Sequence, residues 1–195
     1  GTGVQAWTNV NFARYKEDGL FADANLSNNN NILGLAEFAL APKDGTITKV
    51  EMLLRLRELR DAGPTDSLVA QLYFNNAPYS AVTKTWTGVD LPGGVGTDHL
   101  LTWDVTSLQS GGWTWPMFAN DYTEILLTAN PGSGSTKGDF GLDSVEFRIT
   151  TNASNCGGPS NTILTVPLTD TFDADLLRFL RASPTQNSTI TTGTA

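Results

Sequence analysis

Acidic side chains are the residues of this chain that are best suited to metal binding or acid–base chemistry. Calcium takes oxygen ligands from carboxylates, amides and backbone carbonyls, and two paired carboxylates can hydrolyse a glycosidic bond. Of these two uses the sequence favours calcium, but there is no EF-hand spacing, and solvated, turn-forming loops are the commoner explanation of such residues. The carboxylates that could hold calcium are Asp18, Asp23, Asp139 and Asp143.

The sequence lacks the signatures of nucleophilic catalysis and of zinc-dependent catalysis. His99 is the only histidine, and Asp98 or Asp104 could join it in a triad, but the chain has no Gly-x-Ser-x-Gly nucleophile elbow. One histidine and one cysteine are also too few for structural zinc, which needs about four such ligands. We therefore predict a protein that is not an enzyme.

Five tryptophans could contribute either to the core or to a ligand site. Aromatic faces can stack on sugar rings, but the same side chains fill sandwich cores and cap their ends, which is the commoner role. Trp103 alternates with apolar residues and is expected in the core. Trp113 and Trp115 flank a turn, so they are the better candidates for exposure and for glycan binding.

Charge and composition narrow the functional classes. With 12 basic and 20 acidic residues the net charge is −8, and the chain lacks the basic footprint that nucleic-acid binding requires. No apolar run approaches the roughly 18 residues of a membrane span. Only 16% of the residues are charged, and Ser, Thr, Asn and Gly are abundant, which is typical of an extracellular, cell-surface or virion protein.

Export would expose the chain to modification. Triplets for N-glycosylation begin at Asn25, Asn152 and Asn187, although such triplets are frequent by chance in a chain of this composition. Cys156 is the only cysteine, so it cannot form an internal disulfide. It can pair between chains or stay a solvated thiol in a loop, which is the commoner state.

Alternating residues predict that residues 1–151 form one all-β domain. In the segment 46–57, Val50, Met52 and Leu54 alternate with mostly charged residues, which favours a strand over the helix that its composition would also allow. The segment 142–150 alternates in the same way and is expected to be the closing strand. Short strands between Gly- and Pro-rich turns are typical of a β-sandwich.

Four motifs occur in order along this domain: Trp7-Thr-Asn-Val-Asn-Phe-Ala13 with Asp18 and Ala22-Asp-Ala-Asn25, then Asp44-Gly-Thr-Ile-Thr-Lys-Val-Glu51, Trp113-Thr-Trp-Pro-Met-Phe-Ala-Asn120 and Leu142-Asp-Ser-Val-Glu-Phe-Arg-Ile149. Taken in this order, the motifs resemble those of jelly-roll β-sandwich modules of phage tail or virion proteins and of bacterial secreted or surface proteins. Trp103-Asp-Val-Thr-Ser-Leu108 is also similar to a motif of secreted carbohydrate-binding-like modules. The resemblance covers roughly residues 5–150. It implies a jelly roll in an extracellular or virion setting and no particular activity, because such modules are usually accessory parts.

The C-terminal part lies outside this domain. We interpret residues 152–161 as a linker, residues 162–168 as an edge strand because Pro167 lacks an N–H donor, and residues 171–181 as a short amphipathic helix. Residues 162–195 are expected to form an arm that binds a neighbouring copy, with packing onto its own sandwich as the alternative. The expected assembly contacts are Ile163, Leu164, Val166, Leu168, Leu176, Leu177, Phe179 and Leu180.

Together these observations predict a structural subunit of an extracellular filament, or of a virion surface or tail. Its body would be an antiparallel jelly-roll β-sandwich, and its C-terminal extension would mediate self-assembly. A glycan-binding adhesin module that recognises cell-surface glycans is the second hypothesis, and an accessory domain of a larger secreted enzyme is the third. The expected partner is the chain itself rather than nucleic acid or a membrane, and calcium is the one cofactor considered.

Overall fold

The computed structural model describes most of the first 153 residues and two short segments after them. The described ranges are 4–14, 19–26, 30–36, 45–60, 63–75, 77–118, 122–133, 138–153, 160–167 and 170–172. These ranges are mostly β-strand, and their helices are short 3-10 turns, so the predicted all-β class is confirmed.

The elements follow one another along the chain with short connections. The strands are β1 (Val4–Ala6), β2 (Ala22–Asn25), β3 (Asn30–Ala36), β4 (Thr46–Arg60), β5 (Ser67–Phe74), β6 (Ala77–Thr87), β7 (Asp98–Asp104), β8 (Thr123–Asn130), β9 (Asp139–Ala153), β10 (Ser160–Pro167) and β11 (Asp170–Phe172). The 3-10 helices are η1 (Val10–Arg14), η2 (Gly88–Asp90), η3 (Thr106–Leu108) and η4 (Trp115–Phe118). Within the described ranges, none of the helices has the length and hydropathy needed to cross a membrane.

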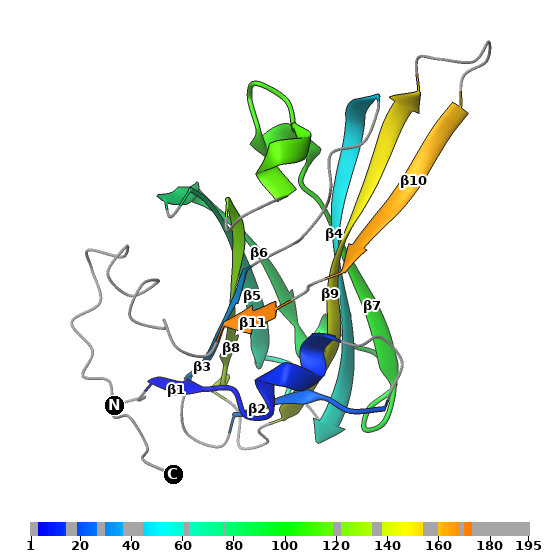
Figure 1. The fold of residues 1–195 in the computed structure, drawn as a ribbon. Coiled ribbons are helices and arrows are strands. Elements are labelled where there is room, and N and C mark those ends of the chain that lie inside the picture. Colours follow the sequence, from blue (N-terminus) through cyan, green and yellow to red (C-terminus); the bar gives the residue numbers. More distant parts are fainter. Residues whose placement is uncertain are drawn as a thin grey trace.

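The strands β2 to β9 form two sheets with the strand order of an eight-stranded jelly roll (Figure 1). One sheet has the order β3-β8-β5-β6, and the other has the order β2-β9-β4-β7. Successive strands of the chain therefore alternate between the sheets, except at the β5–β6 hairpin, and neighbouring strands are antiparallel. The predicted jelly-roll sandwich is confirmed.

The alternation in β4 separates the core from the outer surface of its sheet. Val50, Met52 and Leu54 are fully buried between the two sheets, whereas Arg55 and Arg57 are only partly buried on the outer side. The segment is a strand, as predicted, and not a helix. Its pattern of burial leaves charged side chains on the outer face, where a ligand can reach them.

A buried carboxylate fastens two loops of the sandwich to each other. Asp66 is fully buried and accepts hydrogen bonds from the backbone N–H groups of Gly63 at 2.9 Å, Gly132 at 2.6 Å and Gly138 at 2.7 Å. A Cβ at Gly132 would overlap the side chain and backbone of Thr65, so the chain can approach this closely only with glycine there. The loop before β5 is thereby held against the loop between β8 and β9.

Two strands beyond the jelly roll lie on sheet edges of the same chain (Figure 1). β10 pairs antiparallel with β9 along its whole length, from Ser160 opposite Ala153 to Pro167 opposite Glu146. The predicted edge strand is therefore present. β11 pairs antiparallel with β3, so the first two residues of the predicted helix 171–181 lie in a strand. The rest of that helix lies outside the described residues.

Candidate functional site

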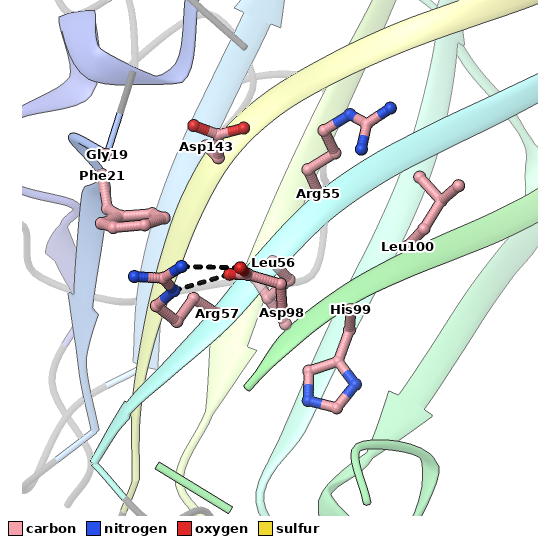
Figure 2. Close-up of a pocket in the computed structure, with 9 residues that line it drawn as sticks. All are labelled: Gly19, Phe21, Arg55, Leu56, Arg57, Asp98, His99, Leu100 and Asp143. Carbon is pink, nitrogen blue, oxygen red and sulfur yellow. Dashed lines mark hydrogen bonds and ion pairs between the residues drawn. The ribbon is translucent and has the colours of Figure 1, made fainter. Parts of the chain in front are cut away.

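A groove on the outer face of the β2-β9-β4-β7 sheet is the candidate site (Figure 2). Its volume is about 410 Å³, which falls within the range of about 300–1,000 Å³ that is usual for small-ligand pockets. Its lining comes from three strands and the segment before β2, and consists of Gly19, Phe21, Arg55, Leu56, Arg57, Asp98, His99, Leu100 and Asp143.

Strand alternation and register bring the charged side chains of the groove together. β4 directs Arg55 and Arg57 outward because Leu56 between them faces the core, where it is 1% exposed. β4 pairs with β7 so that Arg57 lies opposite Asp98 and Arg55 lies opposite Leu100. Side chains that face each other across antiparallel strands have Cβ atoms about 4.5–5.5 Å apart, which is close enough for direct contact.

Arg57 and Asp98 form a bidentate ion pair in the groove (Figure 2). Nε and Nη2 of Arg57 each donate to one carboxylate oxygen of Asp98 at 2.6 Å. The guanidinium carbon also lies 4.9 Å from the centre of the Phe21 ring, which is a cation–π contact. The hydrogen bonds from Arg57 lower the pKa of Asp98, and the same bonds raise the pKa of Arg57. Both groups are therefore charged at neutral pH.

A β-bulge in β9 places Asp143 at the groove. Arg55 of β4 pairs with Ser144, but the next residue of β4 pairs with Leu142, so Asp143 is an extra residue in β9. Bulges commonly redirect a side chain in this way. Asp143 is 7% exposed and adds a second carboxylate to the lining.

Phe21 and Leu100 bound the groove on opposite sides (Figure 2). Phe21 packs closely onto the outer surface of β9, because a Cβ at Gly141 would lie only 2.9 Å from the Cβ of Phe21. Leu100 on β7 is 50% exposed. The groove thus has an apolar side chain at each end and charged groups between them.

His99 borders the groove from the core side of β7. Its ring projects to the opposite side of the strand from the leucine that follows it (Figure 2). Burial lowers the pKa of His99, so the imidazole is neutral at pH 7. Asp98 is bonded to Arg57, and Asp104 accepts hydrogen bonds from the backbone N–H and hydroxyl of Thr106. Both carboxylates that the sequence offered as triad partners are therefore engaged elsewhere.

Among the predicted calcium ligands, Asp23 and Asp139 lie near each other on the paired strands β2 and β9. Asp143 lines the groove, Asp23 lies on β2, and Asp139 forms an ion pair with Arg60 at 2.7 Å. Burial raises the pKa of Asp23, and repulsion by Asp139 adds to this shift. Within the ranges that the structure describes, no three or more His, Cys, Asp or Glu side chains are grouped so as to hold a metal ion. Asp18 lies outside these ranges.

Trp113 and Trp115, the candidates for glycan binding, are buried. They are 5% and 9% exposed, and their indole N–H groups donate to the carbonyl oxygens of Val105 at 3.0 Å and Gly45 at 3.1 Å. Trp113 also stacks on Phe118 with ring centres 5.1 Å apart, and further ring contacts reach phenylalanines of β5 and β9. Both indoles therefore belong to the core, the role that sequence analysis gave as the commoner one, and offer no open face to a glycan.

The other predicted sites lie only partly in the described residues. Asn25 on β2 and Asn152 on β9 are exposed. Ile163, Leu164 and Val166 lie in β10, opposite residues 150, 149 and 147 of β9. The residues outside the described ranges are Cys156, Leu168, Leu176, Leu177, Phe179, Leu180 and Asn187.

The groove could not be recognised from the sequence. Arg57 and Asp98 are 41 positions apart, and nothing near either residue in the sequence indicates the other. The available signal was the outward arginines of the segment 46–57 and the aspartate that begins the segment 98–104. These residues can be recognised as parts of one site only when the register of β4 and β7 is known.

Comparisons with known proteins do not place the chain in a family. No family model matches it, and no curated protein matches it.

Proposed function

We propose that this protein is a non-enzymatic structural subunit of an extracellular filament, or of a virion surface or tail. It assembles through its C-terminal arm, which includes β10 and β11. The jelly roll is the body that the assembly repeats.

The pairing of β10 with β9 is the observation that supports this proposal. β2 to β9 complete the jelly roll without β10. β2 covers only residues 139–142 of the β9 edge, and β10 covers residues 146–153. A strand edge of this length would otherwise offer its N–H and C=O groups to other chains. The body therefore has an edge that accepts one added strand.

A second copy offers β10 the same edge. Strand addition depends on main-chain hydrogen bonds, which β9 provides equally in every copy. Exchange of an identical element between copies needs no new interface, so it is a low-cost route to oligomers. Exchange that closes on itself gives dimers or rings, and exchange that does not close gives filaments. In the assembly β10 pairs with β9 of a neighbour instead of its own.

Deletion of residues 154–195 tests the role of the arm. We expect the full chain to form regular particles or filaments by negative-stain electron microscopy and light scattering. The truncated chain keeps all strands of the jelly roll, so we expect it to retain its β-type circular dichroism and to lose the particles. A full chain that stays monomeric at every concentration, or a truncated chain that forms the same particles, would refute the proposal.

A disulfide between β9 and β10 separates exchange from other modes of assembly. Asn152 and Asn161 are opposite each other in the ladder, and facing residues of antiparallel strands lie within disulfide range. In a Cys156→Ser background, Asn152→Cys with Asn161→Cys would fix the arm on its own sheet when oxidised. We expect this oxidised monomer not to assemble and the reduced protein to assemble. The single Asn161→Cys variant is the control and should assemble in both states.

A further inference from the structure

We propose that the groove between Phe21 and Leu100 is a binding site for a neutral saccharide. The site does not involve the arm, so this inference is independent of the proposed assembly. It also differs from the glycan site that was predicted at Trp113 and Trp115, where both indoles are buried.

The charges of the groove balance one another. Arg55 and Arg57 carry two positive charges, and Asp98 and Asp143 carry two negative charges. His99 adds none, because burial lowers its pKa. An anionic ligand would meet both carboxylates, and a cationic ligand would meet both guanidinium groups, so the groove favours an uncharged ligand.

Hydroxyl groups match the hydrogen-bonding groups of the groove. A hydroxyl both donates and accepts, and the Arg57–Asp98 pair places donors and acceptors side by side. The side chain of Asp98 is 67% exposed, and an ionised carboxylate has lone pairs beyond the two that Arg57 uses. A ligand hydroxyl can therefore donate to Asp98 while the ion pair stays intact. Such charge-assisted hydrogen bonds are stronger than those between neutral groups.

Apolar side chains flank this polar centre. Leu100 is 50% exposed on one side, and Phe21 on the other side is partly buried. A sugar ring carries hydroxyls around its rim and C–H groups on its faces, so it can contact both kinds of surface at once. Apolar walls around a few converging polar groups are the usual arrangement of a small-molecule site.

The polar centre is fixed before a ligand arrives. Two hydrogen bonds to Asp98 and the cation–π contact with Phe21 hold the guanidinium of Arg57 in one orientation. Binding therefore need not immobilise this long side chain, and a preorganised group loses less entropy on binding than a mobile one.

A glycan array with neutral, uronic-acid and sulfated saccharides tests the inference on the full chain. We expect binding to neutral glycans only, with little change between about 0.05 and 0.5 M NaCl, because screening weakens only interactions between charges. The affinity for the best neutral oligosaccharide would then be measured by calorimetry. We expect Asp98→Asn and Leu100→Ala each to weaken it about tenfold or more, the equivalent of about 1.4 kcal/mol.

Asp104→Asn is the matched control. Asp104 lies at the other end of β7 and points to the same face of the sheet, but it does not line the groove. We expect this variant to bind like the unmodified protein, and circular dichroism to show that all three variants are folded. An array without neutral hits, a preference for acidic glycans, or affinities that Asp98→Asn and Leu100→Ala leave unchanged would overturn the inference.

Discussion

Replacement of Asp66 by alanine is expected to destabilise the jelly roll strongly. The carboxylate is fully buried and accepts three backbone N–H groups, two at Oδ2 from Gly63 and Gly138 and one at Oδ1 from Gly132. A hydrogen bond to a charged group contributes a net of about 1.5–3 kcal/mol, and a buried donor left without a partner loses more than the bond itself. Loop relaxation and entry of water offset part of this loss, so we expect Asp66→Ala to lower the free energy of unfolding by about 3–5 kcal/mol.

Asp66→Asn separates the loss of hydrogen bonds from the loss of volume. Asparagine has nearly the same shape but only one acceptor oxygen. That oxygen can take the place of Oδ2 and keep the bonds from Gly63 and Gly138, while the amide N–H₂ then faces the N–H of Gly132. One bond is lost and two donors face each other, so we expect a loss of about 1.5–3 kcal/mol. The order of stability is therefore the unmodified chain, then Asp66→Asn, then Asp66→Ala.

Urea unfolding followed by tryptophan fluorescence measures these differences. For an m-value of about 2 kcal/mol/M, a loss of 4 kcal/mol lowers the midpoint by about 2 M urea without changing the slope. Asp90→Asn is the control, because Asp90 also accepts a backbone N–H, that of Thr87, but is exposed; we expect a smaller loss there. If Asp66→Ala unfolds within about 0.5 M of the unmodified chain, or if Asp66→Asn is as unstable as Asp66→Ala, the reasoning about the three hydrogen bonds is wrong.

Two further predictions concern the core and the response to acid. Trp113→Ala removes a buried ring that contacts Phe118 and phenylalanines of both sheets, so we expect it to lower the free energy of unfolding by about 3–5 kcal/mol in the same assay; unchanged stability would contradict the core assignment. The hydrogen bond from Arg148 holds the pKa of Glu51 below its ordinary value of 4.5, so this carboxylate stabilises the fold fully above that pH and less as the pH falls through the folded-state pKa. The difference in the free energy of unfolding between the unmodified chain and Glu51→Gln should therefore be largest near pH 7 and shrink below about pH 4.5. Urea titrations across this pH range measure it. A constant difference would show that the ion pair is not its cause.

The strands of this protein could be predicted because each is specified by its own residues. The segments 46–57 and 142–150 were expected as strands and lie within β4 and β9. The alternation in β4 outweighed its helix-forming composition, because the strand can bury one face between two sheets and leave the other outside. The two-residue period therefore predicted the fold class. The jelly-roll order of the strands was predicted from the resemblance and not from the period.

The burial of Trp113 and Trp115 could not be predicted from their position beside a turn. Trp113 is covered by aromatic residues of β5 and β9, and Trp115 donates a hydrogen bond to Gly45, 70 positions away. A turn is usually at the surface, but here the turn folds into the open end between the sheets (Figure 1). Whether a side chain is exposed depends on the residues that pack on it, and here those residues come from distant strands.

The fold class of this protein follows from its local residue patterns. Its two-residue periods, its Gly- and Pro-rich turns and Pro167 led to an antiparallel sandwich with an added edge strand, because strand formation and turn geometry depend on neighbouring residues. The place where the charged groups meet depends instead on how distant strands pair. The pairing of β4 with β7 sets Arg57 opposite Asp98, and the bulge in β9 adds Asp143. Register arises from contacts between whole strands, and a shift of one residue would reverse which side chains face outward.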